Sequence, residues 1–279
     1  MAITFSFFDK AAVEIETDQL KGSVNPWRLC TVTQVEELKA IIRLLPIWAS
    51  GIIFSTIYSQ MGSLFVLQGE RMDTRVGHSN FKIPAASLSI FDTLSVIFWV
   101  PIYDRIIVPV TRKFTGYKNG LTQLQRMGIG LFISIFAMVV AAILEHESLK
   151  MIKRHNYYEL KEMPMTIFWQ VPQYFLIGCA EVFTFIGQLG VFLRTSTRRN
   201  EEFLLCSITY HRCLSSLLVT IVSNATAMNG KPGWIPDNLS YGHIDYFFWI
   251  LAALGVLNLG VYVLFANWYT YKKAVGTLR

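Results

Sequence analysis

The sequence predicts an all-α membrane protein built from hydrophobic helices that cross a lipid bilayer. Hydrophobic residues make up 53% of the chain and charged residues only 16%, whereas soluble domains typically carry about 25% charge. The apolar residues form long continuous runs, and a helix needs about 20 such residues to cross the hydrocarbon core. Barrel strands would show short segments of alternating polarity instead. Because only helices and closed barrels can span a bilayer, these runs predict helices.

Six segments of the chain are candidate spans. They are Ile41–Leu67, Ala85–Pro109, Leu121–Leu144, Met165–Leu189, Phe203–Val222 and Tyr246–Ala266. The fifth is the weakest, because His211 and Arg212 stand near its middle and an ionised residue at the bilayer centre costs at least about 2.5–3.5 kcal/mol. The sequence therefore predicts five clear spans and one that is disrupted.

The distribution of basic residues predicts how the bundle is oriented. With the amino terminus inside, the segments predicted to be cytoplasmic contain fifteen Lys and Arg residues, and the opposite side contains eight. Cytoplasmic loops of membrane proteins carry an excess of these residues, so we expect both termini to be cytoplasmic. The transmembrane bundle is expected at residues 35–271, between a polar segment at 1–34 and a cytoplasmic tail at 272–279.

Several function classes are disfavoured by the residue patterns. The formal net charge is +6, but the basic residues lie at the ends of apolar runs rather than along a stripe, so no nucleic-acid binding is expected. The sequence has no HExxH pair, no GxSxG elbow and no GxxxxGK[ST] loop, which disfavours an enzyme and ATP-driven transport. Its five histidines and four cysteines are scattered, so no metal and no cofactor are expected. A carrier, a channel and a structural membrane protein remain open.

Polar residues inside the spans are the candidate functional residues, because ionisable groups in a membrane are costly. Glu181 lies mid-span with no basic residue within helical reach. It is either a substrate or proton site, or the partner of a basic residue on another helix. Asp92 is either functional or hydrogen-bonded to nearby Ser and Thr hydroxyls. Tyr58 and Gln60 interrupt an apolar face in the first span, where such groups more often bond a neighbouring helix than a ligand.

Several longer runs resemble one family of transporters. The matching runs are Asn25–Lys39, Ile102–Arg105, Phe114–Gly116, Gln123–Gly130, Gln170–Phe175 and Asn229–Leu239. They resemble plant peptide and nitrate transporters, the plant branch of the proton-dependent oligopeptide transporter family within the major facilitator superfamily. The resemblance covers most of the chain.

The resemblance implies a fold. The family has twelve helices in two six-helix halves, with alternating access around a site near the bilayer midplane. This chain resembles helices seven to twelve only, which implies the six-helix carboxy-terminal bundle of such a transporter, with the fifth span in the place of family helix 11. Residues 1–34 then resemble the end of the cytoplasmic loop that links the halves.

The resemblance also implies a function, namely proton-coupled symport of di- and tripeptides across a plasma or vacuolar membrane. Protons, short peptides, the lipid bilayer and a separate amino-terminal half are the implied partners. Glu181 falls on the tenth-helix glutamate that pairs with the peptide amino terminus in such relatives. Asp92 falls where animal and bacterial relatives often carry an asparagine that lines the cavity, and Gln60 is expected to line it too. Tyr58 falls where a nitrate-carrying relative has a histidine, which favours peptide over nitrate.

One stretch departs from the family pattern. Residues 190–213 replace the run that leads into the eleventh helix, and family character returns at Leu214. The replacement resembles a shifted reading frame that is restored downstream. Because a single half lacks the other wall of the cavity and its eleventh helix is disrupted, we expect this chain to carry nothing when it is expressed alone. The alternatives are a non-transporting fragment or partner subunit, and a carrier of nitrate or another small solute.

Overall fold

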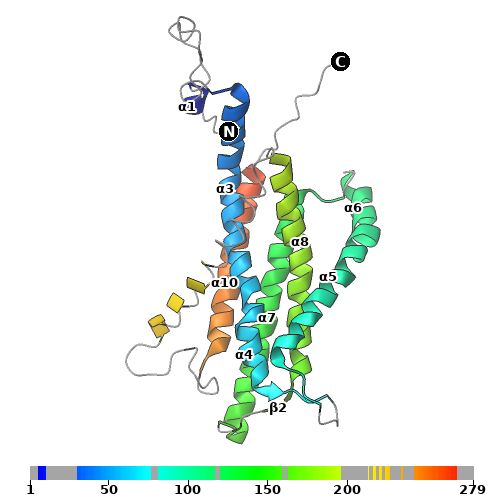
Figure 1. The fold of residues 1–279 in the computed structure, drawn as a ribbon, viewed down its shortest axis with the longest axis vertical. Coiled ribbons are helices and arrows are strands. Elements are labelled where there is room, and N and C mark those ends of the chain that lie inside the picture. The colour runs from blue at the N-terminus through cyan, green and yellow to red at the C-terminus, as the bar shows by residue number, and fades with distance from the viewer. Residues whose placement is uncertain are drawn as a thin grey trace, which may run out of the picture.

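The computed structural model describes most of the predicted bundle. The described residues are 6–10, 30–76, 81–116, 120–158, 160, 163–195 and 242–268, with 213, 216–217, 220–221, 224–226 and 234 between the last two ranges. This part of the chain is mostly helical, and its long helices run side by side (Figure 1). Two short strands, β1 (Met72–Asp73) and β2 (Met163–Thr166), pair in parallel at one end of the bundle.

Several of the helices are joined end to end by short 3-10 or π-helical turns. Their bounds are α1 Ser6–Asp9, α3 Val32–Ser59, α4 Leu64–Glu70, α5 Ile90–Ile102, α6 Val108–Thr115, α7 Gln123–His155, α8 Val171–Thr195 and α10 Ile244–Trp268. A 3-10 turn at Gln60–Gly62 joins α3 to α4, and a π-helical turn at Tyr103–Ile107 joins α5 to α6. Further 3-10 turns at Ala85–Ser89 and Ile167–Gln170 lead into α5 and α8.

Local sequence explains where two of the long helices begin. Thr31 caps α3 by accepting from the Gln34 amide at 3.3 Å, and the Gln34 side chain accepts from the Thr31 amide at 2.9 Å. Thr122 and Gln125 form the same reciprocal pair at the start of α7. Each pair satisfies two backbone donors that a helix otherwise leaves unpaired. Both starts are therefore determined locally.

Four stretches of the described residues are long and apolar enough to cross a membrane. They are Leu45–Glu70, Ala85–Thr115, Gln123–His155 and Ile244–Trp268. They coincide with the predicted first, second, third and last spans, which are thereby confirmed as membrane-length helices. The predicted fourth span begins too early, because its residues 165–170 lie in β2 and a 3-10 turn, and α8 covers the rest. α8 is not one of the four, and it carries the polar Gln173, Glu181 and Gln188. The predicted fifth span lies mainly outside the described residues, so the count of six stays a prediction.

The long helices run in both directions along the bundle (Figure 1). α3 begins and α10 ends at the same end of the bundle, while α7 runs from that end to the opposite one (Figure 1). This arrangement suits the predicted orientation with both termini on one side, which itself stays a prediction. Residues 190–195 of the predicted frame-shifted stretch, 190–213, form the end of α8. Residues 196–212 and the tail, 272–279, lie outside the described residues.

α7 forms the centre of the bundle and packs closely against α8. A Cβ added to Gly130 of α7 would lie 2.1 Å from Thr184 Oγ1, and one added to Gly187 of α8 would lie 2.7 Å from Met127 Cγ. Small residues at such points let two helix backbones approach closely in a membrane. The α7–α8 pair is thus a tight unit against which the other helices pack.

Candidate functional site

Three of the four predicted site residues come together between α3, α5 and α8. The Glu181 carboxyl on α8 lies within hydrogen-bonding reach of both the Asp92 carboxyl on α5 and the Tyr58 hydroxyl on α3. Asp92 is only 5% exposed, and Tyr58 and Glu181 are partly buried. Two acids and a phenol therefore meet inside the helical bundle.

A close contact between α5 and α8 brings the two carboxyls together. A Cβ added to Gly178 would lie 2.8 Å from both the Asp92 carbonyl oxygen and Ser95 Cβ. The Ser95 hydroxyl donates to the Phe175 carbonyl at 2.7 Å, which links the same two helices. Residues three apart lie on the same helix face. Glu181 therefore lies on the same face of α8 as Gly178, and Asp92 lies on the same face of α5 as Ser95, so both acids are next to this contact. The pairing of the acids follows from these two small residues.

Aromatic packing holds Tyr58 in place. Its ring stacks on Phe54 with 6.4 Å between centroids, and meets Phe185 edge-on at 5.6 Å. Phe54 and Phe185 also contact each other edge-on at 5.4 Å. Phe185 lies one turn beyond Glu181 on α8, so its contact with the Tyr58 ring places the Tyr58 hydroxyl near the Glu181 carboxyl. Edge-to-face aromatic pairs of this kind typically add about 0.5–1.5 kcal/mol beyond their burial.

The surroundings of the two acids bear on the alternatives left open by the sequence. No Lys or Arg among the described residues interacts with either carboxyl, so in this part of the chain Glu181 is not one half of an ion pair. Ser87 and Ser89 donate to backbone carbonyls at 2.7 and 3.0 Å, and Asp92 Oδ1 has no hydrogen-bond partner. Ser87 and Ser89 therefore do not hold the Asp92 carboxylate, which disfavours the interpretation of Asp92 as locally hydrogen-bonded.

Gln60, the fourth predicted residue, has its amide engaged close to its own helix. Its side chain is fully buried, and Nε2 donates to the Thr56 carbonyl at 2.8 Å and to Ser59 Oγ at 3.3 Å. Its Oε1 accepts from the Ser63 hydroxyl at 3.3 Å. These contacts stabilise the turn between α3 and α4, so a lining role for Gln60 stays a prediction.

Comparison with known proteins identifies the family of this bundle. The PTR2 model of the POT family matches residues 3–235. The chain belongs to the POT family. It is 59% identical over 279 residues to Protein NRT1/ PTR FAMILY 8.2 of Arabidopsis thaliana, and 58% identical over 277 residues to Protein NRT1/ PTR FAMILY 8.1 of the same plant. Each alignment covers 97% of this chain and 48% of the relative, so the chain spans about half the length of these relatives.

Solved POT structures share the fold. An auto-inhibited POT family peptide transporter superposes with a TM-score of 0.60 over 88% of this chain and 44% of its own. The POT family transporter PepTSo gives 0.63 over 84% of this chain and 42% of its own. Both are 19% identical to this chain, so they show the fold alone. The family match and the relatives make the chain a multi-pass integral membrane protein of a transporter family, not an enzyme.

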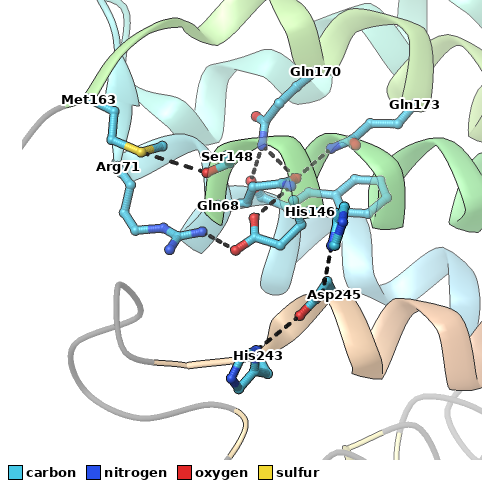
Figure 2. Close-up of polar contacts among 11 residues, drawn as sticks. Gln68, Arg71, His146, Ser148, Met163, Gln170, Gln173, His243 and Asp245 are labelled. Carbon is cyan, nitrogen blue, oxygen red and sulfur yellow. Dashed lines mark hydrogen bonds and ion pairs between the residues drawn. The ribbon is translucent and has the colours of Figure 1, made fainter. Parts of the chain in front are cut away.

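This POT family chain also contains a buried polar network that sequence reasoning missed (Figure 2). We call it the Glu145 network, and it comprises Gln68, Arg71, Glu145, Gln170 and Gln173. Glu145 pairs with Arg71 and accepts from Gln68 Nε2 at 2.9 Å. Gln170 and Gln173 donate to Gln68 Oε1 at 3.0 and 3.1 Å. The network joins the end of α4 to α7 and α8, and the available signal was the pair of amides three residues apart at 170 and 173.

Two histidines that are far apart in the sequence meet at one acid. His146 Nδ1 lies 3.5 Å from Asp245 Oδ2, and His243 Nδ1 lies 3.6 Å from Asp245 Oδ1 (Figure 2). The His243 ring stacks on Tyr246 with 4.9 Å between centroids. The histidines are therefore less scattered in space than in sequence. Even so, no group of three or more His, Cys, Asp or Glu within the described part of the chain is placed to hold a metal ion.

Proposed function

We propose that this chain forms one half of a proton-coupled symporter for di- and tripeptides, in which Glu181 binds the amino group of the peptide. The observation that carries the proposal is the meeting of Tyr58, Asp92 and Glu181 from three helices inside the bundle. Tyr58 and Asp92 contribute a hydroxyl and a second acid to the same site, and Gln60 is proposed as a further lining residue. A few convergent polar groups inside an apolar bundle are typical of a small-molecule site.

The charge of the site favours a cationic group over an anion. Its described members are two acids and a phenol, with no Lys or Arg interacting with them. An ammonium held 4 Å from one carboxylate gains roughly 4 kcal/mol at an effective dielectric constant of 20, and nitrate at the same place loses a similar amount. Desolvation opposes the entry of either ion, so the argument rests on the difference between the attraction of an ammonium and the repulsion of nitrate. A peptide amino terminus therefore suits the site better than nitrate does.

A second half is needed to complete the carrier. Transporters with this architecture bind substrate near the bilayer midplane between two halves, which rock against each other. The chain spans about half the length of its curated relatives, and we propose that an amino-terminal half, in the same polypeptide or as a partner, supplies the other wall. We further propose a plasma or vacuolar membrane as the location, with both termini cytoplasmic.

The proposal is tested by uptake of a radiolabelled dipeptide at acidic external pH. Cells would express this chain alone, and also together with the amino-terminal half of a curated relative. We expect uptake only in the combination, and its loss in Glu181→Gln. Glu147→Gln is the matched control, because the same change of carboxyl to amide falls on a side chain that is 55% exposed, and its uptake should equal that of the unmodified chain.

The other outcomes identify the alternatives. Uptake by the chain alone that Glu181→Gln abolishes would show that the described half is sufficient. Uptake of nitrate without dipeptide would overturn the assignment of the substrate. An absence of uptake in the combination, with the protein confirmed in the membrane, would indicate a non-transporting fragment.

A further inference from the structure

The Asp92–Glu181 pair has a property that peptide binding alone does not explain. Both groups accept hydrogen bonds when ionised, yet their carboxyls lie within hydrogen-bonding reach of each other. Asp92 is only 5% exposed, and its Oδ1 has no hydrogen-bond partner. The contact at Gly178 and Ser95 holds the two backbones close together, so both acids start from helix segments that cannot separate without moving α5 against α8.

Among the described residues, the groups that face the pair do not offset two negative charges. They are Tyr58 from α3, which reaches Glu181, and Tyr174 from α8, which is electrostatically coupled to Asp92. The Tyr174 hydroxyl donates a hydrogen bond to the Met61 carbonyl at 3.4 Å. Within the described residues, α7 and α10 direct no Lys, Arg or His at either acid. Two adjacent carboxylates in such a setting cannot both stay ionised, and one proton shared between them removes the repulsion.

We propose that Asp92 and Glu181 together hold one proton, and so form a proton-binding site within this half of the transporter. The proton comes from hydronium: one of its O–H bonds breaks and leaves water, while an O–H bond forms on one carboxylate oxygen. The new hydroxyl donates a hydrogen bond to the other carboxylate, and the reverse step returns the proton to water. The pair then carries one negative charge, which matches the single positive charge of a peptide ammonium. This last match rests on the proposed function, whereas the proton site itself does not.

Infrared spectroscopy of the full chain in lipid nanodiscs at neutral pH tests the proposal without substrate or a partner half. Protonated carboxylic acids absorb apart from carboxylates, so the shared proton gives a carboxylic acid band. The comparison uses the unmodified chain, Asp92→Asn, Glu181→Gln, the double variant, and Glu147→Gln as the exposed control. We expect the band in the unmodified chain and in Glu147→Gln. Either single variant should reduce the band to the level of the double variant, because the remaining carboxyl loses the acid that shares its proton.

Three results would overturn the proposal. A spectrum of the unmodified chain that equals the double variant would show that both acids are ionised. A band that each single variant halves would show two protons held independently. If a single variant does not fold, the intensity of the carboxylic acid band in the unmodified chain, calibrated against the amide absorption, tests the proposal. That intensity must correspond to one protonated carboxyl rather than none or two. A failure here with intact dipeptide uptake would leave the proposed function standing, and the reverse result would leave the proton site standing.

Discussion

Replacing Arg71 with methionine tests whether the ion pair of the Glu145 network stabilises the bundle. The Glu145 side chain is 0% exposed and that of Arg71 is 10% exposed, so Arg71→Met leaves a carboxylate away from solvent without a cation. Removing one partner of a buried pair typically costs about 3–5 kcal/mol. We expect a loss near 3 kcal/mol, at the lower end of that range, because Gln68 still donates to Glu145 at 2.9 Å.

The assay is denaturant unfolding of the purified chain in detergent, followed by circular dichroism. Adding Glu145→Gln to Arg71→Met removes the stranded charge, so the double variant should regain most of the lost stability. Lys150→Met, on the same helix as Glu145, is the matched control. The Lys150 and Glu147 side chains are 59% and 55% exposed, and exposed pairs contribute little. A loss in Arg71→Met no larger than in Lys150→Met would refute the reasoning, since Glu145 would then not depend on its cation.

Three further changes have definite expected results. Gly178→Ala places a Cβ 2.8 Å from the Asp92 carbonyl oxygen and should cost about 1–3 kcal/mol of unfolding free energy by overpacking. The control Gly260→Ala, with nothing within 4 Å of the added Cβ, should cost nothing measurable. Equal effects of the two changes would contradict the close contact at Gly178. Tyr58→Phe keeps the ring packing and removes the hydroxyl, so dipeptide uptake by the assembled carrier should show a raised KM with an unchanged Tm. An unchanged KM would remove Tyr58 from the site. Thr122→Ala removes a helix cap and should cost about 1 kcal/mol, measured as a lower Tm, with KM unaffected.

The long apolar runs made most of the fold predictable. Four predicted spans reappear as membrane-length helices because the requirement to cover the hydrocarbon core acts on each segment separately. The π-helical turn at Tyr103–Ile107 and the pairing of β1 with β2 were not predictable. Both depend on how neighbouring segments pack, which a single run of residues does not encode.

The candidate site was predictable in its members but only partly in its geometry. Glu181 and Asp92 stood out as acids within apolar runs, and the family resemblance supplied Tyr58. Their meeting depends on where α5 crosses α8, which only the structure provides. The Glu145 network was missed for a related reason: the third span is predicted to end at Leu144, one residue before Glu145, whereas α7 continues to His155.

One helix contact sets the spacing of the helix segments that carry the two acids. The α7–α8 pair is held at one end by the Glu145 network and at the other by Arg126, which lies 3.8 Å from the centre of the Tyr103 ring and donates to the Val182 carbonyl at 3.4 Å. Glu181 sits on this braced pair, while Asp92 enters from α5 through the contact at Gly178. A shift of α5 against α8 would therefore change the spacing of the carboxyls directly. The same contact would then determine both how the pair holds its proton and how it meets an ammonium group.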